Sequence, residues 1–205
     1  MPYKRNQIEE AIGRIFHPDS EKQLLTRLKR LLELDRALGR KHRSQDPEKA
    51  NFAFFSEDAP GTGADISFSE YEVFALLNGL RIMQHSWPQG FAVSIMRRVR
   101  PNLESEHARI LRQNPDKLFD MEAIRAKARP GDIGVDNIDP VFLTLASKDD
   151  ATTRPRPAVC RGIEKVHSFS RDVGASSMTM FEVATLAHRL RAELMKTEPR
   201  RRGRG

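Results

Sequence analysis

A leucine-rich segment between Ser20 and Gly39 constrains the fold more than any other part of the sequence. Its leucines recur at helical spacing and would line one side of an α-helix: Leu24, Leu25, Leu28, Leu31, Leu32 and Leu38. Ser20 and Gln23 form a capping-box pattern at its start, and Gly39 lies where helices commonly end. A helix with one apolar side needs other elements to pack against, so this segment predicts a helical core.

A shorter helix is predicted immediately before this segment. Residues 6–16 carry Ile8, Ala11, Ile12 and Ile15 at i, i+3, i+4 and i+7, and His17-Pro18-Asp19 ends the pattern. The opening unit is therefore expected to be helix, tight turn, helix.

The next part of the chain indicates a loop and then a β-hairpin. Residues 40–49 are polar and charged, which predicts a loop. Two runs with aromatic and β-branched residues, 51–56 and 64–69, flank a turn that contains Pro60-Gly61-Thr62-Gly63. Such a pattern predicts a hairpin.

Two further helices are predicted after the hairpin. Ser69 and Glu72 form a second capping box, and apolar periodicity continues to about Gln84. After a turn at His85-Ser86-Trp87-Pro88, another helix begins at Gln89. Proline disfavours helical geometry in the preceding residue, so Pro101 to Gln113 is predicted to be a separate helix or a kinked continuation.

The second half of the chain mixes strand and helix signals. Residues 141–146 predict a buried strand, residues 158–169 are compatible with either a helix or a strand, and residues 180–195 predict an amphipathic helix. The fold class expected is mainly α, a winged helix-turn-helix with a β-hairpin wing plus a smaller α+β C-terminal region. The expected division is 1–115 for DNA binding, 116–197 for oligomerisation or partner contact, and 198–205 as a disordered basic tail.

Composition excludes several classes of protein. Cys160 is the single cysteine, so an internal disulfide and a cysteine-rich metal site are ruled out and a buried thiol is expected. No apolar run approaches the roughly 20 residues of a membrane-spanning helix, and no signal-peptide pattern follows Met1. We therefore expect a cytoplasmic protein without membrane contact. Histidines and carboxylates show no metal-ligand or catalytic spacing, so no metal, cofactor or enzymatic activity is predicted.

The charge of the chain points to a polyanionic partner. Thirty-five Lys and Arg residues against 28 Asp and Glu give a net charge of +7. Most of the candidate contacts lie opposite the leucines of the 20–39 segment, and others lie in the hairpin turn and near residue 100: Lys22, Arg27, Lys29, Arg30, Arg36, Arg40, Thr62, Arg97, Arg98 and Arg100. Guanidinium groups read guanine edges and lysines neutralise phosphates, although a solvated helix face has the same pattern.

The order of these elements resembles the DNA-binding domain of MerR-type regulators. The resemblance is carried by residues 67–72, by Leu80-Arg81-Ile82-Met83, and by the Trp87-Pro88-Gln89-Gly90 corner with the helix after it. It covers roughly the first half of the chain. The resemblance implies a helix-turn-helix, a wing and a following helix pair that together bind DNA.

The function predicted from the sequence is transcriptional regulation by a homodimer bound to double-stranded DNA. Two copies are expected because one such helix reads only a few base pairs. A protein partner is expected to bind through residues 116–197. Two alternatives remain open: a protein–protein adaptor whose basic face is only solvated, and an RNA-binding protein that uses the Arg-Gly tail from Arg200 to Gly205.

Overall fold

The computed structural model describes residues 2–16, 20–57, 66–128, 134–149 and 154–199. The described chain is mainly helical, with two small antiparallel sheets. The elements in chain order are β1 (Tyr3–Lys4), α1 (Arg5–Phe16), α2 (Glu21–Leu38), α3 (Pro47–Ala50), β2 (Ser67–Phe68), α4 (Glu70–Gln84), α5 (Gln89–Ile110), α6 (Pro115–Leu118), α7 (Met121–Lys127), β3 (Val141–Ser147), β4 (Arg156–Arg161), α8 (Gly162–Val173), β5 (Ser177–Glu182) and α9 (Ala184–Met195).

The chain divides into two compact units. Unit 1 comprises residues 1–100 and 189–205, and unit 2 comprises residues 101–188. Helices α5 and α9 each contribute residues to both units. The division that the sequence predicted after residue 115 falls inside unit 2.

Helices α1 and α2 form the predicted helix pair of unit 1. The Ser20 hydroxyl accepts a hydrogen bond from the Gln23 N–H at 3.4 Å. Helix α2 ends at Leu38, and the next residue, Gly39, caps it with a φ of 58° that suits glycine. Of the predicted apolar side, Leu24, Leu28, Leu31 and Leu32 are buried and Leu25 is half-buried, whereas Leu38 is exposed at the end of the helix. Helix α2 packs against α1 and α4, so the two predictions of helix position are confirmed.

Helix α4 is the most deeply buried helix of unit 1. The Ser69–Glu72 capping box is formed in both directions, as predicted. Nearly every residue of α4 up to Leu80 is buried, including Asn78, whose side chain donates to the Phe74 carbonyl at 2.9 Å. This helix is surrounded by other parts of unit 1 and presents little surface to water.

The predicted hairpin is wrong for the part of it that the structure describes. Residues 51–56 form no strand, and β2 instead pairs antiparallel with β1, with Phe68 opposite Tyr3. Phe52, Phe54 and Phe55 are buried because they belong to the core of unit 1. Thr62 and the turn at residues 60–63 lie outside the described residues, so the predicted wing stays a prediction at its tip.

Helix α5 continues through Pro101. Of the two alternatives predicted from the sequence, the structure contains a continuation, which ends at Ile110 rather than at Gln113. Pro101 itself is exposed, while Val99 and Leu103 on either side of it are buried. Pro101 supplies no backbone donor, and the helix is anchored in the core by these buried neighbours on either side of it.

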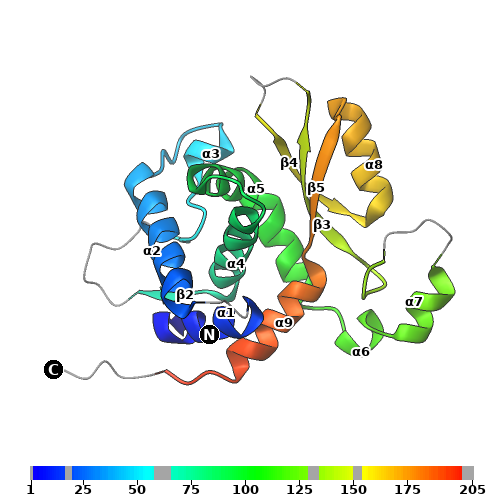
Figure 1. Cartoon of the computed structure of the whole chain (residues 1–205), viewed down its shortest axis with the longest axis horizontal. Coiled ribbons are helices and arrows are strands. Elements are labelled where there is room, and N and C mark those ends of the chain that lie inside the picture. The colour runs from blue at the N-terminus through cyan, green and yellow to red at the C-terminus, as the bar shows by residue number, and fades with distance from the viewer. Residues whose placement is uncertain (1, 17–19, 58–65, 129–133, 150–153, 200–205) are drawn as a thin grey trace. The chain divides into compact units, whose positions relative to one another are not determined.

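Unit 2 is built on a three-stranded antiparallel sheet in the order β4-β3-β5. Phe142 of β3 lies opposite Cys160 of β4, and both pack with Val166 of α8 in one apolar cluster. Helix α8 lies along the sheet (Figure 1) and packs against β3 and β4. Cys160 is buried, as predicted, and burial raises the pKa of its thiol.

The strand predicted at residues 141–146 is confirmed, and the ambiguous segment 158–169 contains the end of β4 and most of α8. The helix predicted from Met180 begins only at Ala184, because the preceding residues form β5. Met178 and Met180 are two residues apart in β5, so both side chains lie on the sheet face that α8 covers. The predicted helix began too early because Met180 was counted with the apolar residues of α9, although it belongs to β5.

Candidate functional site

The outward side of α2 carries the largest group of predicted contacts. Lys22, Arg27, Lys29 and Arg30 are all exposed, while the opposite side of the helix is buried in unit 1. The buried leucines fix the rotation of α2 about its axis, so the same cationic side always faces the solvent. Eighteen helical residues span roughly 27 Å, which is long enough to follow a groove of duplex DNA over several base pairs.

The charges on this side are largely uncompensated within the described part of the chain. Lys29 lies 3.7 Å from Glu33, and both side chains are more than half exposed. Among the described residues, Lys22, Arg27 and Arg30 form no ion pair. An exposed pair such as Lys29–Glu33 stabilises a fold by little, so it leaves Lys29 available to an anion.

Arg36 and Arg40, at the end of α2, are half-buried and lie over aromatic rings. The Arg36 guanidinium is 5.8 Å from the ring centre of Phe55, and that of Arg40 is 5.3 Å from the ring centre of Phe52. Arg40 also donates weakly to the Ser56 carbonyl, at 3.5 Å. These two residues therefore hold the 52–56 segment as well as carrying charge.

Arg97 has a structural role, which corrects its prediction as a phosphate contact. Its side chain is 4% exposed and donates to the Asp35 carboxylate at 2.6 Å and to the Asp35 carbonyl at 2.6 Å. It also donates to the carbonyls of Gly39 at 2.8 Å and Glu48 at 3.4 Å. With these partners and this burial, the guanidinium is inaccessible to a phosphate.

Arg100 is corrected for the same reason. It is 7% exposed and donates to the carbonyls of Phe52, at 2.9 Å, and Phe55, and to the Ser56 hydroxyl at 3.2 Å. Glu72 accepts hydrogen bonds from the backbone N–H groups of Ser56 and Ser69. Arg98, between the two buried arginines, is half-buried.

Asp35 completes this buried network and explains why residues 52–56 are not a strand. Its carboxylate accepts the N–H groups of Ala53, at 3.1 Å, and Phe54, at 2.9 Å, beside Arg97. Burial raises the pKa of Asp35, and Arg97 and the two N–H groups offset part of that rise. Side chains thus satisfy buried backbone groups that a strand partner would otherwise satisfy.

The sequence contained a signal for this network. Asp35 follows Leu28 and Leu31 at i+7 and i+4, which places a carboxylate on the apolar side of α2. A carboxylate in that position requires a buried cation, and Arg97 supplies it. The sequence also contained basic residues beyond α2 that were not assigned to the site, namely Lys41, Arg43 and Lys49, all of them exposed.

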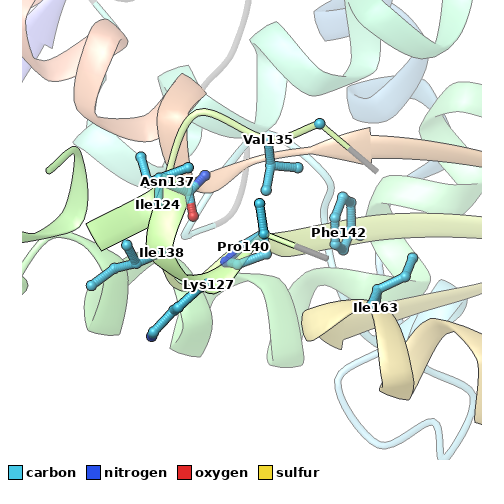
Figure 2. Close-up of a pocket in the computed structure, with 10 residues that line it drawn as sticks. Ile124, Lys127, Val135, Asn137, Ile138, Pro140, Phe142 and Ile163 are labelled. Carbon is cyan, nitrogen blue, oxygen red and sulfur yellow. The ribbon is translucent and has the colours of Figure 1, made fainter. Parts of the chain in front are cut away.

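A separate, mostly apolar pocket of about 270 Å³ lies within unit 2. Figure 2 shows Phe142 and Ile163 on one side of it and Ile124 of α7 across from them. Asn137 also lines it, but its amide donates to Glu182 and Thr185, both at 3.1 Å. Glu182 in turn accepts the backbone N–H groups at the start of α9, so this carboxylate caps a helix.

A half-exposed ion-pair network joins three elements of unit 2. Arg109 donates to Glu106 and to Asp139, both at 2.7 Å, and Gln113 donates to Asp139 at 2.7 Å. Arg161, at the end of β4, donates to Glu106 at 2.5 Å. The network ties the last turns of α5 to β4 and to the segment that precedes β3.

Neither the other kinds of site searched for nor the comparisons with known proteins offer an alternative to the basic side of α2. In the part of the chain that is described, no three His, Cys, Asp or Glu side chains are grouped so that they could hold a metal ion. None of the described helices combines the length and apolarity needed to cross a bilayer. No protein-family model matches the sequence, and no curated protein matches it significantly.

Proposed function

We propose that unit 1 binds double-stranded DNA through the cationic side of α2. The observation that carries this proposal is the outward group of Lys22, Arg27, Lys29 and Arg30 on a helix whose other side is fixed in the core. An α-helix fits the major groove, where arginine and lysine contact guanine edges and phosphates. The roles of transcriptional regulator and of homodimer remain predictions from the sequence.

The structure narrows the set of residues proposed to contact DNA. Arg97 and Arg100 leave the interface because they are buried, and Arg36 and Arg40 act partly through aromatic stacking. Thr62 and Arg98 remain predictions from the sequence. The best supported contacts lie on one side of α2, where a single set of substitutions can weaken them together.

A salt series on a labelled random-sequence duplex tests the proposal. Replacing Lys22, Arg27 and Arg30 by alanine is expected to weaken binding by on the order of 10- to 100-fold. It is also expected to flatten the dependence of log K on log salt by about 0.9 for each phosphate that the variant no longer neutralises. All three side chains are exposed, so the variant should fold, and circular dichroism checks this.

The matched control removes one lysine and two arginines from unit 2. Arg125, Lys165 and Arg171 are exposed, and their replacement by alanine changes the net charge equally. Equal loss of binding in both triple variants would show that only the total charge matters. Absence of duplex binding by the wild type at low salt would refute the proposal, and preference for single-stranded RNA would favour the tail instead.

A further inference from the structure

The polar segment that follows α2 is a closed loop with a defined backbone. The Lys41 N–H donates to the Lys49 carbonyl at 2.7 Å, which joins the two ends of the loop. Inside it, the Ser44 N–H donates to the Lys41 carbonyl at 2.9 Å, and the Asp46 side chain caps α3 through the Glu48 N–H at 3.0 Å. We refer to residues 40–49 as the basic loop.

The buried Arg97 holds both ends of the basic loop from beneath. Its Nη1 group donates to the carbonyl of Gly39, which precedes the loop, and to that of Glu48, near the end of the loop. Its other nitrogens are fixed by Asp35. One guanidinium therefore sets the spacing of the two loop ends, so the loop has its shape before any ligand binds.

The outer surface of the basic loop forms a shallow hollow that is largely open to solvent and is lined by Lys41, His42, Arg43, Ser44 and Lys49. Lys41, Arg43 and Lys49 are exposed, and within the described residues Lys41 and Arg43 form no ion pair. Lys49 forms a long ion pair of 3.7 Å with Asp46, and both side chains are exposed. Two ammonium groups, a guanidinium group and a hydroxyl around one hollow are donors that suit phosphate oxygens.

We propose that this hollow binds a phosphate group of the DNA backbone. The inference rests on the proposed function of α2 and adds a second contact beyond the C-terminal end of that helix. Phosphate contacts position a protein on the duplex without reading its sequence. The basic loop would thus fix the register of α2 in the groove, while α2 itself provides the contacts to base edges.

The test compares three proteins on one duplex: the wild type, the α2 triple variant, and a loop variant with Lys41→Ala, Arg43→Ala and Lys49→Ala. The loop variant is expected to weaken binding of all duplex sequences alike and to flatten the salt slope by about 0.9 to 1.8, equivalent to one or two phosphates. Gln45→Ala, an exposed neutral change in the same loop, is expected to leave binding unchanged.

Neutral methylphosphonate linkages placed singly along the duplex identify the contact itself. At the contacted phosphate, the neutral linkage should weaken binding of the wild type but not of the loop variant. If the loop variant binds like the wild type while the α2 variant is weakened, the loop inference is overturned and DNA binding by α2 stands. If the wild type does not bind duplex at all, both are overturned.

Inorganic phosphate distinguishes a backbone phosphate from a free one. When phosphate replaces chloride at constant ionic strength, duplex binding by the wild type is expected to persist. Suppose instead that a low concentration of phosphate displaces the duplex from the wild type but not from the loop variant. The hollow would then bind free phosphate, and the assignment to the DNA backbone would be overturned.

Discussion

Helix α5 supplies arginines to two polar networks that use the same chemistry at different depths. In unit 1, Arg97 is 4% exposed and Asp35 is fully buried. In unit 2, the side chains of Arg109 and Asp139 are 27% and 32% exposed. Buried ions lose their hydration and depend on each other, whereas half-exposed ions keep part of their water.

The difference shows what each network does for the fold. The buried network of unit 1 supplies hydrogen bonds to irregular backbone at residues 52–56, which has no strand partner. The half-exposed network of unit 2 links α5 and β4, whose backbone groups are already paired in a helix and a sheet, to the short segment before β3. Removing a member of the first network should therefore disturb the core, and removing a member of the second should not.

The largest expected effect is that of Arg97→Ala. This change leaves Asp35 buried beside no cation and frees the carbonyls of Gly39 and Glu48, so the free energy of unfolding should fall by about 3–5 kcal/mol. Arg109→Ala should lower it by roughly 1 kcal/mol or less. Urea unfolding followed by circular dichroism measures both, and equal losses would contradict the comparison.

A double-mutant cycle sharpens this result. If Arg97 acts mainly by compensating Asp35, the variant with both Asp35→Ala and Arg97→Ala should lose much less stability than the sum of the two single variants. Simple additivity would mean that Arg97 stabilises the backbone carbonyls independently of the carboxylate.

Gly79→Ala is expected to have a smaller effect, of about 1 kcal/mol, in the same core. An added Cβ would lie 3.1 Å and 3.2 Å from two ring carbons of Phe54, whose backbone is held by Asp35. Phe54 is fully buried, so we expect overpacking of about 1–3 kcal/mol to exceed the helix-propensity gain of about 1 kcal/mol. Calorimetry or urea unfolding measures the sign.

Gly90→Ala is the matched control for this change. No atom lies within 4 Å of the position that its Cβ would take, and Gly90 is an exposed helical residue. Alanine there should leave stability unchanged or raise it by up to about 1 kcal/mol. Stabilisation by Gly79→Ala as well would show that Phe54 moves freely and that the network does not fix it.

The parts of unit 1 that the sequence predicted are those whose signals are local. Helices α2 and α4 were predicted because a cap and an apolar period are local signals, readable within a few residues of Ser20 and Ser69. Residues 51–56 were misassigned because their backbone partners, Asp35 and Arg100, lie far away in the sequence. A run of phenylalanines indicates burial but does not say what satisfies its backbone.

The same limit applies to the site. The exposed side of α2 follows from helical spacing alone, so Lys22, Arg27, Lys29 and Arg30 were placed correctly on the surface. Arg97 and Arg100 share the helix side of Val93, at i+4 and i+7, next to the main apolar side of α5. Charge alone assigned them to the surface, and only the position of Asp35 on α2 argued otherwise.

The smallest expected effect concerns acid and the half-exposed network. Burial alone would raise the pKa of Asp139, but hydrogen bonds from Arg109 and Gln113 outweigh it and hold the pKa below its ordinary value. For Glu106, hydrogen bonds from Arg161 and Arg109 likewise outweigh burial and lower the pKa. Carboxylates with lowered pKa values stabilise the fold above their ordinary pKa, and this stabilisation is lost as the pH falls through the folded value.

Asp139→Asn should therefore flatten the acid limb of a plot of melting temperature against pH below about pH 4, by the equivalent of less than about 1 kcal/mol. Asp172→Asn, an exposed change on α8, should leave the acid limb as in the wild type. Asp35 and Glu182 have pKa values raised chiefly by burial, which act with the opposite sign, but they are present in both variants and cancel in the difference. Added salt should shrink the Asp139→Asn effect, because the pairs that it removes are in contact with water. An effect that salt leaves unchanged would mean that this network is as deeply buried as that of Arg97, and would contradict the distinction between the two networks.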